Sequence, residues 1–116
     1  MNATDPIKFP GKSGVIYQYW LLTDPKTASA IKAEGGNYAF VKLLANGSVV
    51  PLYFGKADDL RDRIPSHECW PEATRSGVTH VLAHTTPAGD AARSAEERDL
   101  IQLWNPTLNV QHRTTG

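Results

Sequence analysis

An Asn-Gly pair at residues 46–47 separates two short runs of apolar and aromatic residues, and it limits the folds open to this chain more than any other feature. The first run is NYAFVKLL (37–44) and the second is VVPLYFG (49–55). Because Asn-Gly favours the tight turn that joins two antiparallel strands, the pattern predicts a β-hairpin. Pro51 has no backbone N–H to donate, so we expect the second strand to lie at a sheet edge there, or to need no bond at that position.

Turn and cap signals divide the rest of the chain into further short elements. The segments VIYQYWLL (15–22) and VTHVLAHTT (78–86) have the β-branched and aromatic composition of strands. Capping residues and stop signals predict three helices, over residues 24–34, from Asp58 or Asp59 to Ile64, and over residues 90–104. The segment between residues 68 and 77 is expected to be irregular or weakly helical.

The order of these elements predicts a small α+β domain with a mixed or antiparallel sheet of about three core strands, flanked by helices. We divide the chain into a flexible arm (1–13), an extension of one strand and one helix (14–35), a main domain (36–110) and a tail (111–116). A chain of 116 residues is long enough for one domain with a single modest core.

Composition narrows the classes of partner. Twelve basic residues balance twelve acidic ones, so any attraction to an anion must come from a local patch. The single cysteine, Cys69, excludes an internal disulfide and fits a reducing compartment, and we expect a cytoplasmic protein. No apolar run is long enough to span a bilayer and the first residues do not form a signal peptide, so no membrane partner is expected.

Of three familiar motifs, two are incomplete or absent. The GKS sequence at residues 11–13 lacks the earlier glycine and the preceding strand of a phosphate-binding loop, and no G-x-S-x-G of a serine hydrolase occurs. A zinc site is the third. It would use His67 with Cys69 and His80 with His84, but this spacing is unlike the tight, repeated pairs of structural zinc sites.

Two blocks of sequence carry a stronger signal. YFGKADDLRDRI (53–64) places an aromatic–Gly–Lys step at the end of a strand and an arginine on the helix that follows. Glu97 begins the second block, E-x-x-L-I-x(4)-P-x-x-N, which ends at Asn109. Together with Gly36-Asn37-Tyr38 on the first hairpin strand, these blocks resemble the GIY-YIG nuclease superfamily over residues 36–109.

The resemblance implies a metal-dependent endonuclease that hydrolyses DNA, including branched or damaged DNA. Glu97 would hold Mg²⁺ or Mn²⁺, which prefer oxygen ligands and keep several waters, and Arg63 would grip the phosphate with its planar fork. Tyr38 or Tyr53 would assist the attacking water, and His67 would be an alternative base or a phosphate ligand. Phe40 shares a strand face with Tyr38, so either residue could fill the first tyrosine position. Substrate contacts are expected from Gly55, Lys56 and Asn109.

Each of these residues also has a plainer interpretation. Tyr53 could pack on the sheet, and the basic side chains of residues 56–63 could form surface ion pairs with the aspartates between them. Glu97 falls inside the apolar arc of its predicted helix, slightly nearer the middle of that arc than Glu96, and a carboxylate aimed at a core needs a partner or an ion.

Three functions therefore stand side by side: an active nuclease, a nuclease-fold module that only binds nucleic acid or a protein, and a zinc-stabilised interaction domain. A domain with no surplus positive charge should bind DNA weakly alone, so a homodimer or a protein partner would help it.

Overall fold

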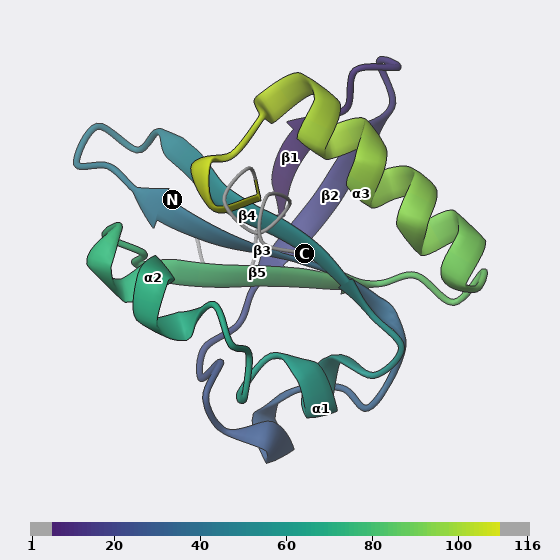
Figure 1. Cartoon of the computed structure of the whole chain (residues 1–116), viewed down its shortest axis with the longest axis horizontal. Helices are drawn as coiled ribbons and strands as arrows, with labels where there is room; N and C mark the ends of the chain where they lie inside the picture. Colours follow the sequence, from purple (N-terminus) through teal and green to yellow (C-terminus); the bar gives the residue numbers. More distant parts are fainter. Residues whose placement is uncertain (1–5, 110–116) are drawn as a thin grey trace.

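The computed structural model describes residues 6–109, and the expected tail at residues 111–116 lies outside this range. Five strands form one antiparallel sheet in the order β1-β2-β5-β3-β4. Their bounds are β1 Ile7–Pro10, β2 Ile16–Leu21, β3 Gly36–Leu43, β4 Val49–Ala57 and β5 His80–Thr85. The helices are α1 Leu60–Arg63, α2 Trp70–Arg75 and α3 Asp90–Trp104, with one 3₁₀ turn at Ala28–Ala30 (Figure 1).

Mixed α and β content was expected, but the prediction of about three core strands was wrong. β2 pairs with β5 through Trp20↔Ala83 and Leu21↔Leu82, so the predicted extension belongs to the same sheet as the main domain. Residues 7–10, expected within a flexible arm, form β1 along the outer side of β2. The pairing is stabilised by Phe9, which is buried against the rings of Tyr19 and Phe54.

The predicted hairpin is confirmed. β3 and β4 pair along their whole length, Gly47 adopts the positive φ of 88° that its turn requires, and the Asn46 side chain accepts a hydrogen bond from the Ser48 amide. β4 is an edge strand, as the proline at position 51 indicated. The register shifts once, between Phe40 and Val41, where Leu52 is the extra residue on β4.

Capping signals predict two of the three expected helices correctly. Asp59 caps α1 by accepting a hydrogen bond from the Asp62 amide, and α3 covers the predicted residues 90–104. The helix predicted over residues 24–34 is wrong, because only a three-residue 3₁₀ turn forms there. That segment has start and stop signals but only one buried apolar side chain, Ile31, so it lacks the apolar face that holds a helix on a core.

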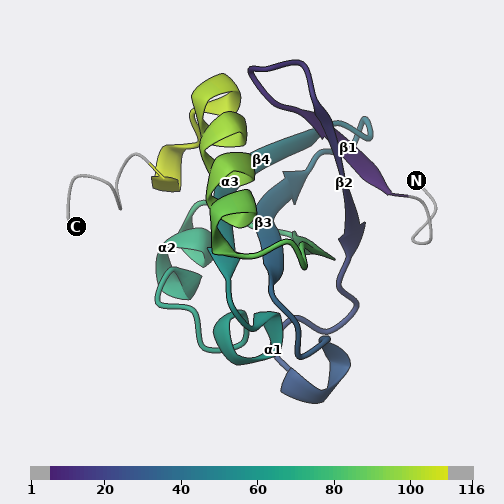
Figure 2. The ribbon, with the colours of Figure 1, turned by 90° about the vertical axis from the view of Figure 1, so that its right-hand side faces the viewer.

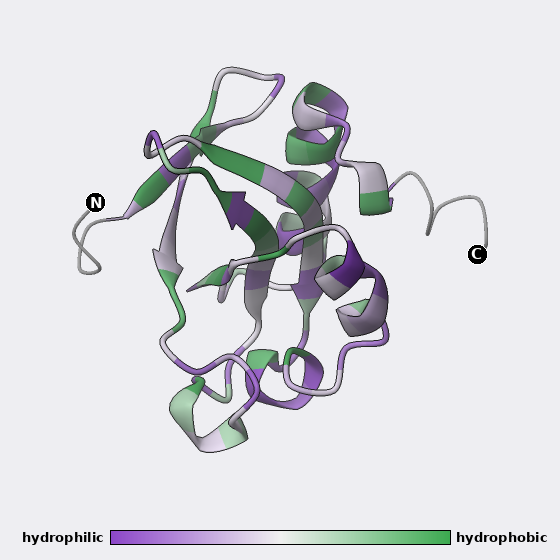
Figure 3. Ribbon diagram, turned by 90° about the vertical axis from the view of Figure 1, so that its left-hand side faces the viewer, coloured by the Kyte–Doolittle hydropathy of each residue, from purple (hydrophilic) through white to green (hydrophobic). Residues whose placement is uncertain are grey.

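The sheet separates two apolar layers. α3 contacts both edge strands, β1 and β4, as well as β3, so the sheet curls around this helix (Figure 2). The layer under α3 includes Phe9, Tyr19, Phe54 and Leu100. The other face carries the second layer, which includes Tyr38, Phe40, Leu60 and Ile64, beneath α1 and α2. Hydrophobic residues run along the crossing strands, while α1 and α2 are mainly hydrophilic (Figure 3).

Within residues 6–109, no helix has the length and apolar character needed to cross a membrane.

Candidate functional site

Tyr38 and Gly55 face each other across the hairpin, and the glycine makes room for the tyrosine ring. The two residues are Cα partners of β3 and β4. A Cβ on Gly55 would overlap Cζ of Tyr38 and lie 2.5 Å from the hydroxyl oxygen. Tyr38 is only 1% exposed. We therefore assign Gly55 to the positioning of Tyr38, whereas the sequence had suggested a direct substrate contact.

His67 joins the two hairpin tyrosines in an aromatic cluster. Its ring centroid lies 5.4 Å from that of Tyr38 and 5.2 Å from that of Tyr53, and the two tyrosine rings are stacked 6.2 Å apart. The His67 side chain is buried, and its Nδ1 accepts a hydrogen bond from the Cys69 amide. That bond assigns the ring proton of neutral His67 to Nε2.

Tyr38 and Phe40 have different neighbours. Phe40 is fully buried and stacks on Trp70, with ring centroids 4.9 Å apart. Tyr38 instead interacts with Arg63, whose guanidinium lowers the pKa of the tyrosine. Burial outweighs this effect and raises the pKa of Tyr38 well above its ordinary value. Tyr38 therefore holds the position beside the arginine.

Arg63 ends α1 and is engaged by a carboxylate. Its two terminal nitrogens donate to Glu68 at 2.7 and 3.1 Å, the fork geometry that a phosphate would also satisfy. Hydrogen bonding to Arg63 lowers the pKa of Glu68 to about 2, so the pair persists at neutral pH. A phosphate that binds Arg63 must displace or share this contact.

Glu97 projects from α3 into a pocket of about 520 Å³ that Tyr53 and Asn109 also line. Burial raises the pKa of Glu97, and no hydrogen bond or ion pair engages its carboxylate within residues 6–109. Burial, with Glu97 as the next largest cause, raises the pKa of Tyr53 to about 12. At neutral pH neither tyrosine is ionised, so either would need added positive charge to serve as a base.

Arg63 and Glu97 come from helices on opposite faces of the sheet and line separate pockets. Arg63 lowers, and Glu97 raises, the pKa of both Tyr38 and Tyr53. Tyr53 on the edge strand β4 links the two sides, because it lines the pocket of Glu97 and its ring stacks on Tyr38, the tyrosine that interacts with Arg63.

Lys56 and Asn109, the other predicted substrate contacts, each already bond a neighbouring group. Lys56 shares a pocket of about 310 Å³ with Arg63, but its ammonium donates to Asp90 at 2.8 Å. Asn109 is buried, and its side-chain amide bonds both the N–H and the C=O of Phe54, at 2.7 and 2.8 Å. Through these two bonds Asn109 braces β4 between Tyr53 and Gly55.

The donor set suits magnesium better than zinc. Glu97 offers one hard oxygen ligand, which is enough for an ion that keeps several waters and binds a substrate phosphate. Within residues 6–109, no three His, Cys, Asp or Glu side chains converge as a structural zinc site would require. The histidines of the zinc hypothesis have separate partners: His67 bonds the Cys69 amide, His80 bonds Thr79 and His84 bonds Glu96.

The sequence missed a buried polar cluster under α3. One oxygen of Glu96 accepts the Tyr19 hydroxyl at 2.6 Å and contacts His84 Nε2 at 2.5 Å. Glu96 is 6% exposed, so it, and not Glu97, lies nearest the core. The apolar arc of the helical wheel includes Leu103 and Trp104, but these side chains are 47% and 37% exposed, so the arc points away from the true buried face. Tyr19 and His84 on apolar strands were the available signal for a buried partner.

No protein-family model, curated protein or solved structure significantly matches this chain.

Proposed function

We propose that this chain is a metal-dependent endonuclease that hydrolyses DNA phosphodiester bonds. The observation that carries the proposal is that Tyr53 lines one pocket with Glu97 and stacks on Tyr38, the tyrosine that interacts with Arg63. A guanidinium, tyrosine hydroxyls and a carboxylate that has no ion-pair partner within residues 6–109 are groups that phosphodiester hydrolysis can use. The resemblance to GIY-YIG nucleases uses the same residues.

Each side chain has a defined task under this proposal. Glu97 would hold a divalent cation, which when bound would stabilise charge on the phosphate and lower the pKa of a water. Arg63 would exchange its contact with Glu68 for the scissile phosphate. Tyr53, which lines the pocket with Glu97, would orient the attacking water. Tyr38, which is almost fully buried, would position Arg63, and His67 contacts both rings.

Loss of plasmid nicking in Glu97→Gln tests the enzyme. We expect the wild-type protein to nick supercoiled plasmid with Mg²⁺ or Mn²⁺ and to stop on addition of a chelator. Glu97→Gln should retain the circular dichroism of the parent and lose nicking by at least about a hundredfold, the cost of removing a transition-state charge contact. Glu34→Gln removes an exposed carboxylate from a loop and is the matched control. Equal nicking by Glu97→Gln and wild type would contradict the assignment.

Release of Arg63 should strengthen DNA binding. In a Glu97→Gln background, which prevents cleavage, Glu68→Gln frees the guanidinium from its carboxylate partner. We expect DNA affinity to rise about three- to tenfold and the slope of log K against log salt to steepen by about one phosphate contact. Fluorescence anisotropy over a salt series measures both. The gain in affinity should vanish when Arg63→Gln is added. A gain that survives this change would show that it comes from the loss of a negative charge and not from the release of Arg63.

A second function is favoured by one observation. Lys56 and Arg63, the two basic side chains expected at the phosphate, are both already in ion pairs, with Asp90 and Glu68. A module that has lost catalysis would bind nucleic acid or a protein partner through this fold. Salt-sensitive binding of DNA with no nicking in any divalent cation would support the module over the enzyme.

A further inference from the structure

The sheet opens between β2 and β5, and a pocket fills the opening. β2 pairs with β5 only at Trp20↔Ala83 and Leu21↔Leu82, while earlier β2 residues, from Ile16 to Tyr19, pair with β1. Among the described strands, the last residues of β5, His84 and Thr85, therefore pair only with β3. The resulting pocket has a volume of about 690 Å³.

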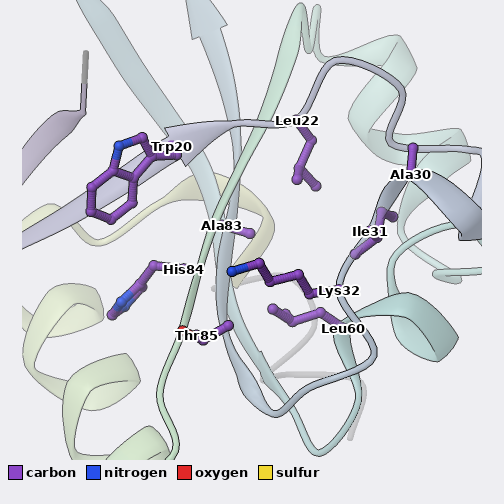
Figure 4. A pocket seen from close by; sticks show the side chains of 9 residues that line it. All are labelled: Trp20, Leu22, Ala30, Ile31, Lys32, Leu60, Ala83, His84 and Thr85. Carbon is purple, nitrogen blue, oxygen red and sulfur yellow. The ribbon is translucent and has the colours of Figure 1, made fainter. Parts of the chain in front are cut away.

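The lining of this pocket has a definite chemistry. Its apolar residues include Leu22, Ile31, Leu60 and Ala83, and Trp20 lies at one side. Two basic side chains, Lys32 and His84, also line it, and no acidic residue does. In Figure 4 the ammonium end of Lys32 points toward β5. A ligand that fits would be flat, partly apolar and anionic.

Trp20 is not explained by the packing of the fold. Its side chain is 43% exposed. The indole N–H groups of Trp70 and Trp104 each donate to a backbone carbonyl, of Ile64 and Pro10 respectively. Within residues 6–109, neither a hydrogen bond from the Trp20 indole nor a stacked ring beside it is present. Its face and its donor are both available to a ligand.

The two basic groups of the pocket differ in their partners. Lys32 has no ion-pair partner among the described residues, in contrast to Lys56 and Arg63. The His84 imidazole contacts the Glu96 carboxylate at 2.5 Å, and its side chain is 18% exposed. Lys32 is therefore the group of this pocket that an anion would contact.

The pocket is next to the proposed active site. Ala83, in its lining, is the Cα partner of Tyr38. Leu60, also in its lining, is the first residue of the short helix that ends at Arg63. Because β5 and β3 separate β2 from β4, Trp20 lies about 14 Å across the sheet from the edge strand. A DNA strand whose phosphate is bound by Arg63 could therefore bring a nucleotide a few positions away to the pocket.

We propose that the Trp20–Lys32 pocket binds an unpaired nucleotide of the DNA substrate, with the base on the Trp20 indole and a phosphate on Lys32. This inference rests on the proposed function for the identity of the ligand. Aromatic side chains stack on any base, and a lysine adds a phosphate contact, so the pocket would favour single-stranded over paired DNA without reading sequence. The enzyme would then act where a duplex is frayed, flapped or branched.

Binding of single-stranded and duplex DNA separates this proposal from its rivals. The protein is the Glu97→Gln variant without metal, and the probes are a labelled single-stranded oligodeoxythymidine and a blunt duplex. Trp20→Ala should weaken single-strand binding about tenfold or more, the equivalent of one lost stacking contact, and leave duplex binding within about twofold. Trp20→Phe should recover most of the loss. Lys32→Gln should reduce the salt slope for the single strand by about one.

The outcomes are decisive in both directions. Unchanged single-strand affinity in Trp20→Ala, or an equal loss for both DNA forms, would overturn the proposal. Displacement of the oligonucleotide by a medium-chain fatty acid at similar affinity would assign the pocket to an apolar carboxylate and would also overturn it. Nicking of plasmid by the wild-type protein is measured separately. A protein that does not nick but binds single-stranded DNA through Trp20 would contradict the proposed endonuclease activity and support the proposed role of the pocket.

Discussion

Replacing Glu96 with alanine is expected to lower the free energy of unfolding by about 3 kcal/mol, the usual cost of breaking a buried charged hydrogen-bond network. Glu96 accepts from Tyr19, which is 0% exposed, and contacts His84. Without the carboxylate, the Tyr19 hydroxyl is left in an apolar layer with no partner. Urea unfolding followed by tyrosine and tryptophan fluorescence measures the change.

Its neighbour Glu97 provides the matched comparison. Burial raises the pKa of Glu97 on folding, so the folded protein holds this proton more tightly than the unfolded chain. As the pH rises through the unfolded pKa of about 4.3, the ionised carboxylate begins to destabilise the fold. Glu97→Gln should therefore be more stable than wild type at pH 7, and this advantage should disappear below about pH 4. If Glu97→Gln instead lowered the free energy of unfolding at pH 7 as much as Glu96→Ala does, the burial assigned to the two glutamates would be contradicted.

Gly55→Ala is expected to destabilise the protein by about 2 kcal/mol, the cost of overpacking a filled site. The usual effect of such a change is a small gain, because alanine restricts the unfolded chain and Gly55 is not among the glycines with positive φ. Here the new methyl would overlap the ring of Tyr38. The same shift would move the Tyr38 hydroxyl away from Arg63, so nicking should fall together with stability.

A double-mutant cycle identifies the cause. Tyr38→Leu removes the hydroxyl and the far end of the ring, and in that background Gly55→Ala should cost less than about 0.5 kcal/mol, as expected for a site with no remaining clash. The comparison uses urea midpoints of the four proteins. If Gly55→Ala is neutral in the wild type, the close packing of ring and strand is absent in solution.

Local chemistry explains which parts of the fold could be predicted. The Asn46-Gly47 turn and the Asp59 cap act within a few residues of themselves, and the structure bears out both. β1 could not be predicted, because its pairing depends on β2 and on the contact of Phe9 with Phe54, far along the chain. Capping signals at residues 24–34 predicted a helix, but no apolar face was available to dock it.

The candidate site shows the same division. Tyr53, Arg63 and Glu97 could be selected because they stand in two compact sequence blocks, and Tyr38 because it lies on the first hairpin strand. The structure brings Tyr53 to one pocket with Glu97 and stacks its ring on Tyr38, while their common site stays a prediction. The hydrogen-bond partners of these side chains could not be predicted. Arg63 bonds Glu68 and Asn109 bonds the Phe54 backbone because tertiary packing brings these groups together. The order of burial of Glu96 and Glu97 depends on Tyr19 and His84 beneath the helix, which a helical wheel does not contain.

The brace that Asn109 provides has a consequence for the behaviour of the protein in concentrated solution. An open sheet edge is a template on which the strands of other molecules can assemble into aggregates. The N–H and C=O of Phe54 point away from β3 on such an edge, and the Asn109 amide satisfies both, while Pro51 removes a further donor from the same strand. A single side chain thus imitates one residue of a sixth strand, and the edge that carries Tyr53 and Gly55 is closed to self-assembly at Phe54 while the surface beside it stays accessible.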